Sequence, residues 1–234
     1  MERRQFLRVC TMVAGAAQLG SVGDAWAGAE PRLYGRSKLV DVHGAPIRLG
    51  DLALKTNYVF NYPYAGTPCF LLDLGRSVAA AENVLRADGA SYAWTGGVGP
   101  AHSVVSYSAI CAHKLAYPTR DISFIRFQSE RSPTSDGNVI HCCADHSVYD
   151  PASGARVLAG PAPQPLAAIL LDYDAATDEL SALGTVGAEQ FDAFFRKYEF
   201  KLAMEHGQAR AQKAVGGTTV VRELEQYCKQ TIQC

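Results

Sequence analysis

The chain has 234 residues, of which 48% are hydrophobic and 19% are charged, and its formal net charge at pH 7 is −1. This balance is that of an ordinary globular protein, with neither the basic field of a nucleic-acid-binding protein nor the charge excess of a disordered tail. We therefore expect no nucleic-acid partner, and the function has to be sought in motifs.

The first residues are typical of an export signal. Arg3-Arg4 is followed by Phe6-Leu7, a weakly apolar stretch over 9–22 and a small-x-small site at Ala25-Trp26-Ala27. This pattern predicts a twin-arginine signal peptide over 1–27 and a periplasmic protein. The alternative is a basic N-terminal helix of a cytosolic protein. A membrane span needs about twenty apolar residues, so we expect membrane contact only if this segment is retained as an anchor.

The central part of the chain, 38–187, is predicted to be a single β domain. Short segments rich in Val, Ile, Tyr and Phe alternate with Asp, Gly, Pro and Ser clusters, which is typical of strands and turns. The fold class expected is therefore mainly β, an antiparallel barrel or sandwich, with one short helix at 78–86. The predicted strands are 38–43, 57–62, 68–74, 103–110, 122–127, 139–142, 168–173 and 179–183.

The last segment, 188–234, is predicted to be a helical extension. Apolar residues recur at helical spacing in two runs, which Gly216-Gly217 separates. We favour an arm folded back on the β core, and the alternative is a docking arm for a partner subunit. The two runs are Phe191, Phe194, Phe195, Tyr198 and Leu202, and then Val220, Val221, Leu224, Tyr227 and Cys228.

Two short motifs carry metal-binding side chains, and each follows a predicted strand. Cys111-Ala112-His113 and Cys143-Ala144-Asp145-His146 each pair a cysteine with a histidine. In a Rieske centre two cysteines ligate one iron and two histidines the other. We therefore predict one [2Fe–2S] cluster per chain, held by Cys111, His113, Cys143 and His146. Two Cys and two His could also hold zinc. However, two motifs that each contain one Cys and one His, about thirty residues apart on β loops, fit a Rieske centre better.

The residues around these motifs resemble a known family. The second motif continues into Ser147-Val148-Tyr149-Asp150, so that the whole resembles the Rieske signature. The flanking stretches, within 38–187, resemble the small subunit of arsenite oxidase. They are Phe60-Asn61-Tyr62-Pro63, Thr67-Pro68-Cys69, Gly96-Gly97-Val98-Gly99-Pro100, Ser106-Tyr107-Ser108-Ala109-Ile110-Cys111 and the stretch from Leu171-Asp172-Tyr173-Asp174 to Leu180.

This resemblance implies a Rieske-type β fold and an electron-transfer subunit, with catalysis residing in another chain. The expected partners are a large oxidoreductase subunit with a molybdopterin cofactor and a c-type cytochrome. The resemblance also implies that Ser147 donates its hydroxyl to a bridging sulfide and that Tyr149 donates to a cysteine sulfur. Hydrogen bonds of this kind raise the potential, which runs from roughly −150 to +300 mV in Rieske centres against about −400 mV in plant-type ferredoxins.

The sequence departs from the family pattern in three places. Ala116 and Asp145 occupy the positions of a bridging disulfide that some Rieske proteins have, and the second loop is one residue short between His146 and Asp150. The helical extension has no counterpart in the family pattern.

Prolines 161, 163 and 165 are expected to form a rigid third loop over the cluster.

The remaining cysteines suggest a disulfide. In an oxidising compartment Cys228 and Cys234 are the expected pair, while Cys142 is interpreted as a buried or disulfide cysteine and His141 as a strand residue.

Two other functions remain open. One is the Rieske subunit of a quinol–cytochrome c oxidoreductase, and the other is a zinc-stabilised binding module.

Overall fold

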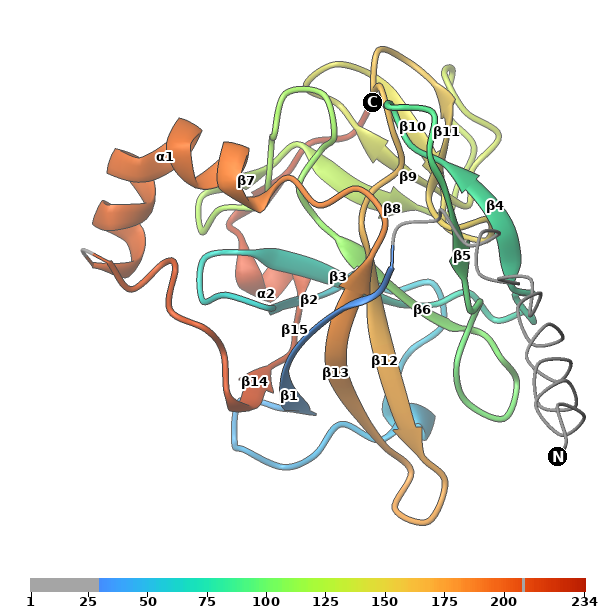
Figure 1. Ribbon diagram of the computed structural model, residues 1–234, viewed down its shortest axis with the longest axis vertical. Coiled ribbons are helices and arrows are strands. Elements are labelled where there is room, and N and C mark those ends of the chain that lie inside the picture. Colours follow the sequence, from blue (N-terminus) through green and yellow to red (C-terminus); the bar gives the residue numbers. More distant parts are fainter. Residues whose placement is uncertain (1–29, 208) are drawn as a thin grey trace, which may run out of the picture.

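The protein is mainly β in the computed structural model, which describes residues 30–207 and 209–234 (Figure 1). The predicted signal over 1–27 lies outside the described residues. The elements are β1 (Arg32–Val40), η1 (Leu49–Asp51), β2 (Tyr58–Asn61), β3 (Pro68–Asp73), β4 (Ala81–Leu85), β5 (Ser91–Trp94), β6 (Val104–Ser108), β7 (Ile122–Ser123), β8 (Ile125–Gln128), β9 (Val139–Cys142), β10 (Ser147–Asp150), β11 (Arg156–Ala159), β12 (Ala168–Asp174), β13 (Glu179–Val186), α1 (Phe191–His206), β14 (Gly217–Val220), β15 (Arg222–Glu223), α2 (Leu224–Tyr227) and β16 (Gln230–Thr231).

The largest sheet has eight strands in the order β14-β1-β13-β12-β6-β3-β2-β15. Its two edge strands, β14 and β15, follow each other directly in the sequence. β14 pairs with β1 in parallel, and β15 pairs with β2 antiparallel. Thr219 of β14 also donates its hydroxyl to the carbonyl of Asn61 on β2, 2.8 Å away. Residues 217–223 therefore bring the two edges of the sheet together, which makes it barrel-like and protects both edges.

The strand β3 lies inside the large sheet and has apolar residues on both faces. Side chains alternate along a strand, so Phe70 and Leu72 join one apolar cluster while Cys69 and Leu71 join another. The first cluster fills the space toward a second sheet of four strands, in the order β11-β10-β9-β8. This smaller sheet lies above the large one in Figure 1. The mainly β prediction is confirmed.

The C-terminal part differs from the prediction in its second half. The helix predicted on the first apolar run is present as α1, and its buried Phe191, Phe194, Phe195 and Leu202 pack beside the loop that follows β6. The second run is not a helix but β14, β15, the single turn α2 and β16. These strands pair with β1, β2 and β7. The segment is thus folded onto the β core, as favoured, but largely as strands.

A second local correction concerns 78–86, which was predicted to be helical. Strand β4 occupies most of this segment and pairs with β5 as an antiparallel hairpin. Val84 is the buried residue of this strand, and the register shifts between Ala81 and Val84, so the burial pattern does not alternate strictly. Among the described residues no helix is long and apolar enough to cross a membrane.

Candidate metal centre

The first motif lies in a tight loop immediately beyond β6. The N–H of Cys111 donates to the carbonyl of Ala116 (2.8 Å), and the N–H of Leu115 donates to the carbonyl of Cys111 (2.9 Å). Leu115 has a φ of 57°, which reverses the chain. The loop buries the Cys111 side chain completely and leaves His113 exposed.

The second motif forms the turn between β9 and β10. The N–H of His146 donates to the carbonyl of Cys142 (2.7 Å), and His146 itself has a φ of 58°. Gly160, after β11, approaches this turn so closely that a Cβ there would lie 2.4 Å from the His146 carbonyl oxygen. A glycine is therefore required at 160, at the start of the proline-containing loop.

The two loops bring four metal-binding side chains together. The ligand atoms of Cys111, Cys142 and Asp145 lie within 4.8 Å of one another. Asp145 Oδ2 accepts a hydrogen bond from Cys111 Sγ at 3.3 Å and lies 3.0 Å from His113 Nδ1. The Asp145 side chain is only 2% exposed, whereas that of His113 is 36% exposed. The site thus has two sulfur donors, one nitrogen and one oxygen, and the histidine that supplies the nitrogen is partly exposed to solvent.

Hydrogen bonds between these groups shift their pKa values. The Cys142 thiol donates to Cys111 and, with Tyr149, lowers the pKa of Cys111 to about 7, although burial opposes this. The same donation, together with burial, raises the pKa of Cys142 well above its ordinary value. Burial tends to raise the pKa of Asp145, but hydrogen bonds from the Ser147 backbone, Cys111 and His113 lower it overall.

Tyr149 and Ser147, which the resemblance places beside the cluster, both lie near this group. The Tyr149 hydroxyl is 3.4 Å from Cys111 Sγ and accepts a hydrogen bond from the N–H of Ala112 (3.0 Å). The Ser147 hydroxyl is fully buried and has no hydrogen-bond partner among the described residues. A buried hydroxyl without a partner is costly, so it indicates an acceptor that belongs to a bound group.

The structure does not bring all four predicted ligands together. It places Cys143 in a disulfide with Cys234, and a cysteine in a disulfide has no thiolate to offer a metal. The disulfide predicted between Cys228 and Cys234 is wrong, because Cys234 is bonded to Cys143. Cys228 is a free, buried cysteine whose thiol donates to the carbonyl of Leu224 at 3.1 Å.

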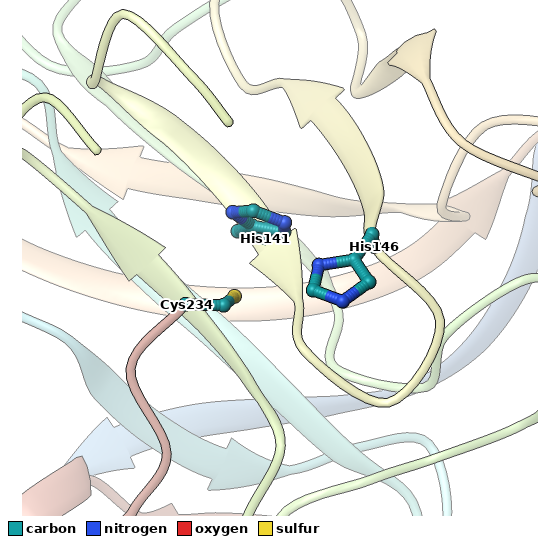
Figure 2. A group of neighbouring side chains, drawn as sticks. All are labelled: His141, His146 and Cys234. Carbon is teal, nitrogen blue, oxygen red and sulfur yellow. The ribbon is translucent and has the colours of Figure 1, made fainter. Parts of the chain in front are cut away.

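His146 lies beside His141 and not with Cys111. Figure 2 shows the two imidazoles side by side, His141 on β9 and His146 in the turn after it, with Cys234 close by; the ring planes make an angle of 65°, an edge-on arrangement. Their ring centroids are 5.9 Å apart. His141 is completely buried, and neither of its ring nitrogens has a hydrogen-bond partner among the described residues. Since the sulfur of Cys234 is bonded to Cys143, this group offers only the two imidazoles.

The residues that converge have donor atoms that suit an iron–sulfur cluster, with one histidine where a Rieske centre has two. The sulfurs of Cys111 and Cys142 belong to the same buried apolar cluster, while His113 and Asp145 offer the nitrogen and oxygen donors. The unpartnered Ser147 hydroxyl and the Tyr149 hydroxyl suit the sulfur acceptors of such a group. Cys142 and Asp145, which the structure brings beside Cys111, were not among the predicted ligands. The one-residue shortening of the second loop was the signal that could have pointed to them.

No family model matches the chain. Among solved structures it is similar to the soluble domain of the Rieske protein II (soxF) from Sulfolobus acidocaldarius. The two are 29% identical over 65% of this chain and 78% of that domain, with a TM-score of 0.48.

Proposed function

We propose that this protein is a Rieske-type iron–sulfur protein that carries single electrons in the periplasm as a subunit of an oxidoreductase complex. The observation that carries the proposal is the convergence of two loops, each supplying one buried cysteine and one nitrogen or oxygen donor. The Cys-x-His motif at Cys111 and the Ser-x-Tyr-Asp stretch from Ser147 support it.

The chain itself would bury the cluster, tune it and give it one exposed side. When bound, a [2Fe–2S] cluster takes up and releases one electron at a time. Cys111 and Cys142 lie in the buried apolar cluster, which keeps water from the sulfurs. Tyr149 places its hydroxyl against Cys111 Sγ. His113, 36% exposed, is the side of the site that an electron partner can reach.

For the partners we propose a large subunit with a molybdopterin cofactor on one side and a c-type cytochrome on the other. The support is the resemblance of the flanking stretches, such as Phe60-Asn61-Tyr62-Pro63, to the arsenite oxidase small subunit. The large subunit would carry out the catalysis, and this chain would relay the electrons.

Metal and sulfide analysis of the purified full chain tests the cofactor. We expect about two irons and two sulfides per chain, and a reduced-state EPR signal whose average g lies below that of all-cysteine clusters. A colourless protein containing one zinc per chain would overturn the proposal in favour of a zinc-stabilised module.

Affinity purification of the tagged full chain from periplasm tests the partners. We expect a large subunit that contains molybdenum to co-purify, and we expect arsenite to reduce the cluster in that complex, so that its reduced-state EPR signal appears. A complex that lacks molybdenum but shows quinol-dependent reduction would replace this assignment with a quinol–cytochrome c oxidoreductase, and the electron-transfer role would stand.

A further inference from the structure

We propose that the cluster of this protein has only one histidine ligand, and that Asp145 takes the place of the second histidine. The ligands would then be Cys111 and Cys142 on one iron and His113 and Asp145 on the other. This inference rests on the proposed function, and it replaces the Cys143 and His146 that the motif suggested.

The strand β9 determines which of the two adjacent cysteines reaches the site. Successive side chains of a strand point to opposite faces, so Ile140 and Cys142 share one face and His141 and Cys143 share the other. Ile140 and Cys142 both belong to the buried apolar cluster that contains Cys111. Cys143 instead bonds to Cys234, and its N–H donates to the carbonyl of Phe124 at 2.6 Å.

The Asp145 carboxylate is in an environment that suits a metal ligand. Its side chain is 2% exposed and lies among two sulfurs and an imidazole. Oδ1 accepts the N–H of Ser147 at 3.0 Å, which fixes the rotamer and leaves Oδ2 directed at Cys111 and His113. A carboxylate is otherwise costly to bury, and it is retained where it is paired or coordinates a metal.

The spacing of the second motif agrees with this assignment. Cys142-Cys143-Ala144-Asp145 has the same Cys-x-x-ligand spacing as Cys143-Ala144-Asp145-His146. Starting from Cys142 removes the one-residue shortening before Asp150, so that Ser147 and Tyr149 come into the expected positions. His146 then occupies the turn position with a φ of 58°, and its exposed ring lies beside His141.

The exchange of a neutral imidazole for a carboxylate has a consequence for the cluster. It adds one negative charge next to the irons, so adding an electron becomes less favourable. We therefore expect a midpoint potential below that of a cluster with two histidines and above that of an all-cysteine cluster with the same surroundings.

Pulsed EPR of the reduced full-length protein tests the ligand set directly, because it counts the nitrogen nuclei bound to iron. We expect one coordinating histidine nitrogen in the wild type, and an unchanged spectrum in His146→Gln. In Asp145→His we expect a second coordinating nitrogen and a raised potential. Two coordinating nitrogens in the wild type, one of them lost in His146→Gln, would overturn the inference and leave the proposed function intact.

Substitution of the adjacent cysteines gives a second readout, with iron and sulfide content measured beside circular dichroism. Cys142→Ser should lose the cluster while Cys143→Ser keeps it. Cys234→Ser is the matched control, because it breaks the same disulfide but leaves the Cys143 thiol free. Loss of the cluster in Cys143→Ser but not in Cys234→Ser would overturn the inference. A wild-type protein without iron would instead overturn the proposed function itself.

Discussion

The hydroxyl of Tyr149 lies 3.4 Å from the sulfur of Cys111 while it accepts a hydrogen bond from the N–H of Ala112 at 3.0 Å. Because the amide occupies a lone pair of the phenolic oxygen, the hydroxyl proton is free to point at the sulfur. This arrangement favours the reduced, more negative state of a cluster bound there.

Replacing Tyr149 with phenylalanine should therefore lower the midpoint potential. One net hydrogen bond is worth about 1 kcal/mol, which for a one-electron couple corresponds to about 40 mV. A redox titration followed by EPR measures the shift. Tyr107→Phe is the matched control, since Tyr107 is a buried tyrosine whose hydroxyl donates to the Pro151 carbonyl at 2.7 Å. Equal shifts in both variants would contradict the role given to Tyr149.

The disulfide between Cys143 and Cys234 should stabilise the fold. It joins residues 91 apart in sequence, and removing a disulfide of this kind costs about 2–4 kcal/mol. We expect Cys234→Ser to lower the unfolding temperature, while Cys228→Ser has a smaller effect because Cys228 is unpaired. Mass spectrometry of unreduced peptides checks the connectivity directly. A peptide pair that links Cys228 with Cys234 would show this assignment to be wrong.

The aromatic face of α1 should contribute strongly to stability. Phe194 is fully buried and packs edge-on against Tyr117, with 4.9 Å between ring centroids. Phe194→Ala should lower the free energy of unfolding by about 3–5 kcal/mol, as for other buried phenylalanines. Phe200 of the same helix is 80% exposed, so Phe200→Ala should change it by less than about 0.5 kcal/mol. Similar values for both variants in urea unfolding would show that the helix does not pack as described.

Export is expected to depend on the arginine pair. Changing Arg3 and Arg4 together to lysine should keep the protein in the cytoplasm. The export receptor recognises the arginine pair, and lysine does not reproduce the geometry of the guanidinium group. Fractionation with antibody detection measures this. The matched control is Arg8→Lys, which we expect to be exported normally. If the double variant still reaches the periplasm with its cluster, the assignment of the signal is wrong.

Local patterns predicted the strands and the loops of this protein well where neighbours in sequence are neighbours in the fold. Cys111 and His113 could be placed together from the sequence because they share one short loop. The choice between Cys142 and Cys143 could not, since both have a metal-binding side chain three residues later, and only the facing of β9 separates them. That facing is set by pairing with β8 and β10.

The helix predicted around Val220 is wrong for a related reason. The apolar residues there recur with a helical period, but the segment pairs with strands that are far away in sequence. Residues of β14 pair with β1, and those of β15 pair with β2. Tertiary pairing of this kind overrides local propensity, and periodicity carries no information about it.

The C-terminal segment holds the loops of both motifs at once. Gln190 and Lys197 donate to the carbonyls of Ala112 and Lys114, at 3.0 and 2.5 Å, and so fasten the first loop. The disulfide to Cys143 fastens the second. Under the proposed ligand set, these contacts would leave the ligands little freedom to relax when an electron arrives or leaves. The reorganisation energy of the centre should therefore be small, which is the property that lets an electron carrier exchange electrons quickly with a partner at nearly the same potential.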